Sequence, residues 1–219
     1  MIIEYLQDIN RLSQLATDIV VSDIADQKRF NIGLPTGSTP VGFYQNLITR
    51  SVDWGQVRTF NLDEYIIDHN HPGSYHTYMQ KHLFQHTDIK SENQFFPTID
   101  YDSIIEQHGG LDLTVLGLGH NGHIAFNEPG SDRYSQTRTV FLSDLTQVAN
   151  SRFFDNIPTP RHAITMGIDT ILRSKKILLL VQGTLKLEIL KKAVWGEITE
   201  QIPASFLQTH DSVRILYCD

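Results

Sequence analysis

The fold of this chain follows from one stretch, ILLLVQGTLK at residues 177–186. A nearly continuous apolar run such as residues 177–181 is typical of a central strand that is covered on both faces. A helix is predicted over residues 185–195, directly after the glycine-containing turn. A buried strand that leads straight into a helix is the repeating unit of α/β folds.

The rest of the chain repeats this alternation of short apolar runs and amphipathic stretches. Further strands are predicted over residues 30–34, 57–62, 111–116 and 213–218, and further helices over residues 12–24 and 41–48. We expect Ser38 or Thr39 to cap the helix at 41–48, with Pro40 in its first turn. The alternation predicts an α/β fold with a single open, mostly parallel twisted sheet and helices on both faces, a modified Rossmann-like arrangement. We expect one domain over residues 1–219.

Composition narrows the class of protein. The net charge of −7 argues against broad binding to nucleic acid or to an anionic membrane, but a few local basic groups can still bind a small anion. The single cysteine, Cys218, can form no internal disulfide. Neither a signal peptide nor an apolar run long enough for a bilayer is apparent. We therefore expect a cytoplasmic protein whose partner is a small molecule.

Four unusual segments follow predicted strands, at residues 35–39, 63–65, 117–123 and 182–186. In open α/β sheets ligands bind outside the carboxyl ends of the strands. Because these ends meet at one edge of a parallel sheet, the four segments are expected to form one site.

Two of the segments suit an anion. Thr36-Gly37-Ser38-Thr39 offers backbone amides and hydroxyls before a helix, although a plain capped turn fits as well. Lys186 lies in the first turn of a helix, where an anion would offset the unfavourable dipole, and its alternative is a solvated side chain. Arg152 is a third cationic candidate. The segment at 36–39 lacks the glycine-lysine ending of a Walker loop.

Asp63 and Glu64 follow the strand at 57–62. A carboxylate at a strand end can act as a general base if its surroundings raise its pKa. A helix cap or a solvated acidic pair is the commoner fate of such residues. Tyr75 and Tyr78 follow helical spacing and are interpreted first as packing residues.

The segment GLGHNGHIAFNEPG at 117–130 combines closely spaced glycines with His120, His123 and Glu128. Glycines permit unusual dihedral angles, and a neighbouring carboxylate can orient a histidine and raise its pKa. A metal bound by the two histidines is a weaker alternative, because the spacing matches no common ligand set. The glycines also do not match the dinucleotide fingerprint.

Taken together, the motifs resemble one known family. LPTGSTP at 34–40, FNLDEY at 60–65, GHIAFNEP at 122–129 and ANSRFF at 149–154 are similar, in this order, to the glucosamine-6-phosphate deaminases. The resemblance implies an isomerising hydrolase of amino sugar catabolism and N-acetylglucosamine degradation, within carbohydrate metabolism. Enzymes of this family convert glucosamine 6-phosphate and water to fructose 6-phosphate and ammonia and need no metal or organic cofactor, so the resemblance implies the same reaction for this chain.

The resemblance also assigns roles by position. Asp63 matches the base that moves a proton between C2 and C1, His123 the residue that assists opening of the sugar ring, and Glu128 the acid that tunes or orients this histidine. Arg152 and Lys186 match cationic substrate contacts. The phosphate cradle corresponds to Thr36, Gly37, Ser38 and Thr39.

This sequence departs from the family pattern at two positions. Many members carry an aspartate where this chain has Asn121, so we expect His123 to receive less electrostatic support here. Val140 stands where longer members place a lysine that binds an activator, and those members continue past the position of Asp219. We therefore expect a simple enzyme, more readily a monomer than an allosteric homo-oligomer.

Two other functions remain open. A 6-phosphogluconolactonase has a related fold and similar phosphate binding, but would not need Asp63 as a carbon-proton base. A regulatory sugar-phosphate-binding domain would not need Asp63, His123 and Glu128 together.

Overall fold

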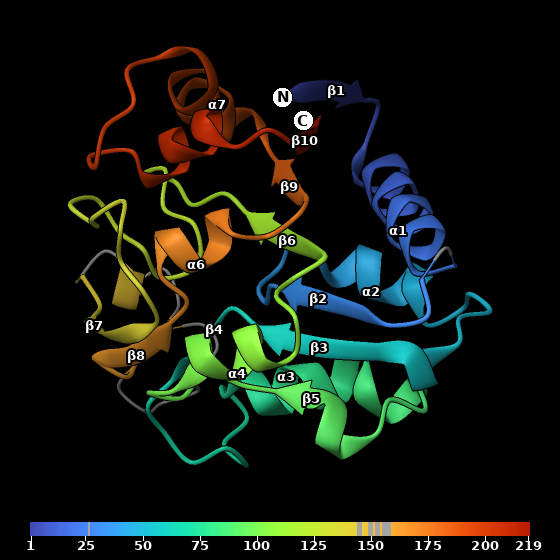
Figure 1. Cartoon of the computed structure of the whole chain (residues 1–219). Helices are drawn as coiled ribbons and strands as arrows, with labels where there is room; N and C mark the ends of the chain where they lie inside the picture. Colours follow the sequence, from blue (N-terminus) through green and yellow to red (C-terminus); the bar gives the residue numbers. More distant parts are fainter. Residues whose placement is uncertain (26, 144–145, 149–150, 152–153, 155–158) are drawn as a thin grey trace.

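The structure is a computed structural model that describes residues 1–25, 27–143, 146–148, 151, 154 and 159–219. Its main element is a seven-stranded sheet with the strand order β1-β10-β9-β6-β2-β3-β5 (Figure 1). Every neighbouring pair in this sheet is parallel. The strands are β1 (Ile2–Leu6), β2 (Phe30–Leu34), β3 (Val57–Asn61), β5 (Gln94–Phe95), β6 (Leu113–Gly117), β9 (Ile177–Gln182) and β10 (Val213–Cys218).

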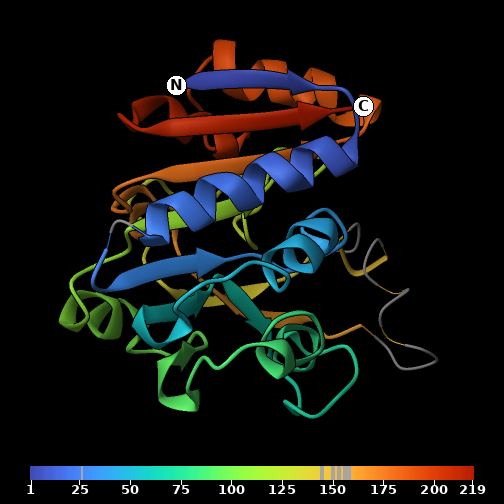
Figure 2. The same ribbon diagram turned by 90° about the vertical axis from the view of Figure 1, so that its right-hand side faces the viewer.

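Helices cover both faces of this sheet, as predicted. The α-helices are α1 (Ile9–Ala25), α2 (Val41–Leu47), α3 (Tyr75–His82), α4 (Tyr101–Gln107), α6 (Ile168–Leu172) and α7 (Leu187–Trp195). Short 3₁₀ helices lie at Trp54–Gln56, Phe84–His86, Ser91–Asn93, Thr184–Lys186 and Pro203–Thr209. Figure 2 shows α1 lying across one face of the strands.

The central strand β9 shows why its sequence is apolar throughout. Leu178 and Leu180 pack into the core with α1, α2 and α3, whereas Ile177, Leu179 and Val181 pack into the core with α4, α6 and α7. Successive side chains of a strand point to opposite faces, so a strand with two covered faces needs apolar residues at every position.

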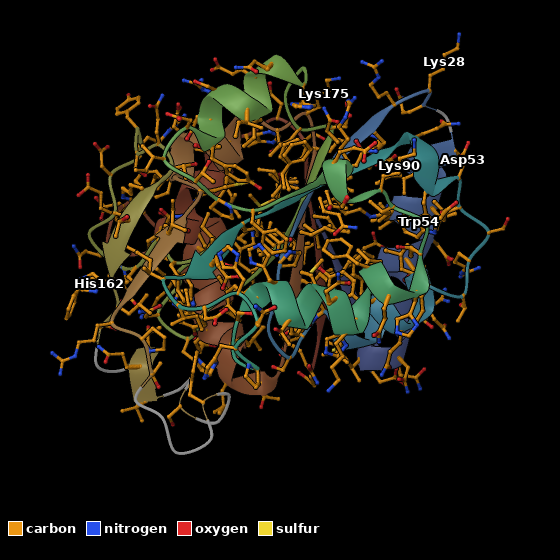
Figure 3. All side chains as sticks on the ribbon, turned by 90° about the horizontal axis from the view of Figure 1, so that it is seen from below. Lys28, Asp53, Trp54, Lys90, His162 and Lys175 are labelled. Atoms are coloured by element: carbon orange, nitrogen blue, oxygen red, sulfur yellow. The ribbon has the colours of Figure 1, made fainter. Side chains whose placement is uncertain are left out.

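A second sheet lies beyond the carboxyl ends of β2 and β3, and the sequence did not predict it. Its antiparallel strands are β4 (Asp63–Tyr65), β8 (His162–Thr165) and β7 (Arg138–Phe141), in the order β4-β8-β7. Figure 3 shows His162, the first residue of β8, far across the molecule from Asp53 and Trp54, which precede β3. Because β4 follows β3 after a single residue, this sheet brings its side chains to the predicted site edge.

Several local predictions need correction. Neither Ser38 nor Thr39 caps α2: Pro40 occupies the N-cap, and no side-chain cap bond is formed. The helix predicted from residue 185 begins as the 3₁₀ turn Thr184–Lys186 before α7. The strands β1 and β5 and the helices α4 and α6 were also not predicted, and of α3 only the helical spacing of Tyr75 and Tyr78 was noted. In the part of the chain that the structure describes, no helix has the length and apolar character needed to cross a bilayer.

Candidate functional site

The turn after β6 places His123 at the carboxyl edge of the main sheet. The Gly119 N–H donates to the His123 carbonyl over 2.9 Å, which closes the turn, and Gly122 has a φ of +84°. A Cβ on Gly119 would lie 2.3 Å from the imidazole ring, so any other residue at this position would displace the ring of His123. The packing of the His123 ring therefore depends on the missing side chain of Gly119, whereas Gly122 supplies the positive φ of the turn.

Asn121 is the direct partner of His123. The distance between Asn121 Oδ1 and His123 Nδ1 is 2.7 Å. The amide oxygen only accepts hydrogen bonds, so Nδ1 carries the proton and Nε2 of the neutral ring is left as an acceptor. Asparagine therefore fixes the orientation and the tautomer of His123 without adding charge.

The pKa of His123 is lowered to about 4, mainly because burial disfavours the charged ring. Glu128 opposes this shift, whereas Lys186 and His120 add to it. Glu128 does act to raise the pKa of this histidine, as expected, but the loss of solvation outweighs its attraction and the net shift is downward. At neutral pH His123 is uncharged and can accept a proton at Nε2.

Glu128 lies within electrostatic reach of His123, but its hydrogen bond is with another residue. The Thr146 hydroxyl donates to Glu128 Oε1. Across the described residues no hydrogen bond joins Glu128 to His123. The structure therefore gives the orienting contact to Asn121 and leaves Glu128 an influence through charge.

The chain between His123 and Glu128 is held by Asn127, which sequence reasoning did not single out. The fully buried Asn127 side chain donates to the carbonyls of Ile124 and Met166 over 3.0 and 2.8 Å. Its oxygen accepts from Arg138 of β7 over 2.9 Å. These bonds maintain a turn in which Ala125 adopts a φ of 50°, an uncommon value for a residue other than glycine.

Asp63 is the first residue of β4 and is only 7% exposed. Burial, with a smaller contribution from Glu64, raises its pKa to about 8. Among the described residues no donor hydrogen-bonds to its carboxylate. The interpretation as a solvated acidic pair is therefore wrong, and Asp63 is an unpaired buried acid that can titrate near neutral pH.

Glu64 is buried as well but is fully paired. Its Oε1 accepts from the backbone N–H groups of Tyr65 and Tyr75, and its Oε2 accepts from the backbone N–H and the Nδ1 of His76, over 2.6–2.9 Å. Since Tyr75 and His76 open α3, Glu64 fixes the start of this helix. The helix-cap alternative thus applies to Glu64 and not to Asp63.

The segment at 36–39 presents unused backbone amides. In the described structure none of the N–H groups of Thr36, Gly37, Ser38 or Thr39 donates to a protein acceptor, and Gly37 has a φ of +96°. Two carbonyls of the same loop are occupied, because Tyr44 donates to the Pro35 carbonyl over 2.6 Å and Tyr78 donates to the Gly37 carbonyl over 2.7 Å. A loop with fixed carbonyls and free amides suits an anion.

Lys186 reaches across to the turn that follows β6. Its Nζ donates to the Leu118 carbonyl over 2.6 Å, and burial lowers its pKa. The side chain is therefore not the solvated lysine of the alternative interpretation. Arg152, the other predicted cation, lies outside the described residues.

The predicted site residues thus form two neighbouring groups. Asn121, His123 and Lys186 are joined through the turn after β6, while Asp63 lies within electrostatic reach of Tyr44 and Tyr75 beside the loop at 36–39. The rings of Tyr65 and Tyr75 both contact Phe126, which belongs to the His123–Glu128 turn. Among the described residues no cluster of three or more histidine, cysteine, aspartate or glutamate side chains could hold a metal ion.

Comparison with known proteins identifies the family. The family described as glucosamine-6-phosphate isomerases/6-phosphogluconolactonase matches residues 7–216. The chain belongs to this family. A glucosamine-6-phosphate deaminase of Oceanobacillus iheyensis is 46% identical, with 96% of this chain and 90% of that protein covered. Glucosamine-6-phosphate deaminase 2 of Bacillus subtilis is 43% identical, with 94% and 90% covered.

Solved structures separate the two branches of the glucosamine-6-phosphate isomerase/6-phosphogluconolactonase family. A monomeric glucosamine-6-phosphate deaminase superposes with a TM-score of 0.94 at 39% identity, covering 100% of this chain and 97% of that one. A 6-phosphogluconolactonase of Thermotoga maritima gives a TM-score of 0.80 at 19% identity, covering 99% and 98%. The second likeness is one of fold alone. The predicted α/β fold and family are confirmed.

Proposed function

We propose that this chain is a glucosamine-6-phosphate deaminase, which converts glucosamine 6-phosphate and water to fructose 6-phosphate and ammonia. One observation carries the proposal: a buried, unpaired carboxylate with a pKa raised to about 8, Asp63, shares a sheet edge with His123, whose pKa is lowered to about 4. A lactonase needs a base for water but no second carboxylate for carbon-proton transfer, so Asp63 favours the deaminase.

Substrate binding starts at the phosphate. Its oxygens accept hydrogen bonds from the free backbone amides of Gly37, Ser38 and Thr39, and the Thr36 hydroxyl belongs to the same loop. Positive charge comes from Lys186 and Arg152. Lys186 already lies at the turn that carries His123. Anchoring the phosphate between these groups fixes the sugar relative to both proton carriers.

Ring opening then falls to His123. Its neutral Nε2 takes the proton of the anomeric hydroxyl and returns it to the ring oxygen, while Asn121 holds Nδ1–H in place. Glu128 partly stabilises the transient positive charge on the ring.

Isomerisation and deamination follow on the open chain. Ionised Asp63 removes the proton from C2 and returns it to C1, while the C1 oxygen takes up the proton that the nitrogen gives up; C1 thereby becomes an alcohol carbon and an imine is left at C2. Water adds to this carbon, the C–N bond breaks, and ammonia leaves with fructose 6-phosphate as the other product.

The cellular setting is part of the same proposal. We place the enzyme in the cytoplasm as a hydrolase of amino sugar catabolism, in N-acetylglucosamine degradation, and as a single-domain monomer over residues 1–219. Val140 occupies the position of the lysine that binds an activator in longer members. Its side chain is partly buried against the cluster around Tyr65 and Phe126, which supports a structural role at this position and not an activator contact. Sedimentation velocity with and without sugar phosphate tests the monomer.

The decisive assay compares ammonia release from glucosamine 6-phosphate with hydrolysis of 6-phosphogluconolactone by the purified chain. We expect the first reaction and not the second. Asp63→Asn should bind the substrate and lose turnover, whereas Asp88→Asn, at an exposed position, serves as the matched control. Normal turnover by Asp63→Asn would refute the mechanism, and lactone hydrolysis alone would refute the function.

A further inference from the structure

Helix α3 touches both ends of the proposed site. At its start, Glu64 of β4 accepts the backbone N–H groups of Tyr75 and His76 over 2.9 Å each. One turn later, the Tyr78 hydroxyl donates to the Gly37 carbonyl over 2.7 Å. The same short helix is therefore bonded to the residue beside Asp63 and to the loop with the free amides.

The bond at the start of α3 is well fixed. Glu64 is 3% exposed, and His76, which also binds its carboxylate, is stacked between His69 and Phe96 with ring centroids 3.8 and 3.4 Å away. Ser74 caps the helix by accepting from the Thr77 N–H over 3.0 Å. A carboxylate with its acceptor sites filled and a stacked partner leaves little freedom for the strand end that carries Asp63.

The bond at the loop leaves the free amides untouched. Tyr78 binds a carbonyl, and its ring contacts Tyr44, whose own hydroxyl holds the Pro35 carbonyl. Removing the Tyr78 hydroxyl therefore frees the position of the loop without removing any group that an anion would contact.

We infer that α3 is a spacer that sets the separation between the phosphate loop at 36–39 and the carboxylate of Asp63, with Tyr78 and Glu64 as its two attachment points. This inference rests on the proposed function. Tyr78 and Glu64 are positioning residues: they hold the groups that touch the substrate and do not react themselves. Tyr78, interpreted from its spacing as packing, gains this second role because its hydroxyl meets the loop.

If α3 is a spacer, loss of either attachment should lower kcat and leave phosphate binding unchanged. Releasing either attachment misplaces the bound sugar relative to Asp63, and small misplacements of reacting groups cost on the order of 10- to 100-fold in rate. The phosphate itself still meets the same amides. We expect Tyr78→Phe to lower kcat at least tenfold and to change the inhibition constant of inorganic phosphate by less than about twofold.

The test uses Tyr78→Phe, Glu64→Gln and the double variant, all at pH 9, where Asp63 is ionised in each protein and the lost charge of Glu64 no longer alters its protonation. Releasing a spacer at both ends should disturb the alignment little more than releasing it at one end. The kcat of the double variant should therefore lie within about threefold of the kcat of the less active single variant. Tyr217→Phe is the control, because it also loses one hydroxyl bond, to Asp219, and should keep its kcat.

Three results would overturn the inference: an unchanged kcat in Tyr78→Phe, a phosphate inhibition constant that rises as much as kcat falls, or single effects that multiply in the double variant. Melting temperatures of all variants separate misalignment from unfolding. A wild-type chain that releases no ammonia would overturn the proposed function and this inference together, whereas an active wild type with unaffected variants overturns the inference alone.

Discussion

The raised pKa of Asp63 has a consequence for folding that is independent of any substrate. An unperturbed aspartate has a pKa of 3.8, whereas Asp63 in the fold has a pKa of about 8, so between these pH values the unfolded chain is ionised at this residue and the folded chain is not. The folded state then loses stability as the pH rises, by about 1.4 kcal/mol per pH unit. Below pH 4 both states are protonated and above pH 8 both are ionised, so the loss is confined to this window.

Asp63→Asn removes this dependence. We expect the free energy of unfolding of the variant, relative to the wild type, to increase by about 3 kcal/mol between pH 5 and pH 7, and to level off above pH 8. Urea unfolding at several pH values measures the difference, with the fluorescence of Trp54, 7% exposed, as one buried reporter.

Asp88→Asn controls for the removal of one acid from the chain, because its carboxylate is exposed. A difference between Asp63→Asn and the wild type that stays constant from pH 5 to pH 8 would refute the reasoning. Asp63 would then be ionised throughout in the folded protein, and burial would not control its protonation.

Three further predictions concern catalysis. Gly119→Ala places a Cβ 2.3 Å from the His123 ring and should displace it. We expect kcat in the ammonia assay to fall by at least two orders of magnitude, about 3 kcal/mol in activation free energy, while circular dichroism shows that the fold is retained. A near-normal kcat would contradict this prediction. Asn121→Asp puts a charge beside His123 Nδ1 and should raise the pKa of this ring, seen by NMR titration and in the pH dependence of ring opening; an unchanged profile would count against electrostatic support from this position. For the wild type, kcat/KM reports the free enzyme and should rise with pH to a plateau above pH 8 as Asp63 ionises. The parameter kcat reports the enzyme–substrate complex and should reach its plateau at lower pH. Coincident pH profiles would show that the substrate does not shift the titration of Asp63.

The central strands of the main sheet were predictable because they are buried on both faces. Residues 30–34 and 213–218 were placed at their observed bounds, since an apolar run bounded by polar residues has few other interpretations. The strand β1 escaped detection because it lies at the edge of the sheet and is partly exposed. In the small sheet β7 escaped for the same reason, since it alternates between half-buried and exposed residues over only four positions, whereas β4 is buried but only three residues long.

The site was predictable as a set of segments but not as a set of contacts. The rule that strand ends share an edge brought Asp63, His123 and Lys186 together, and family resemblance supplied their roles. Neighbouring acids look alike in sequence, yet Asp63 is unpaired and Glu64 fully bonded. Helical spacing indicates that Tyr78 is a packing residue, but it does not predict that the Tyr78 hydroxyl donates to the Gly37 carbonyl. Burial, which decides both pKa shifts, is a property of the whole fold.

The two opposite pKa shifts have one physical cause, and that cause makes the site dependent on its substrate. Burial disfavours charge, so it raises the pKa of Asp63 and lowers that of His123, and between pH 5 and pH 7 both are mainly uncharged in the free protein. A neutral histidine is ready for ring opening, but a protonated Asp63 cannot abstract a proton from carbon. The amino group of the substrate, when it is protonated, brings a positive charge that favours the carboxylate form of a nearby acid. The base would then ionise when the correct sugar is bound, and a phosphorylated sugar without the amino group would leave it protonated.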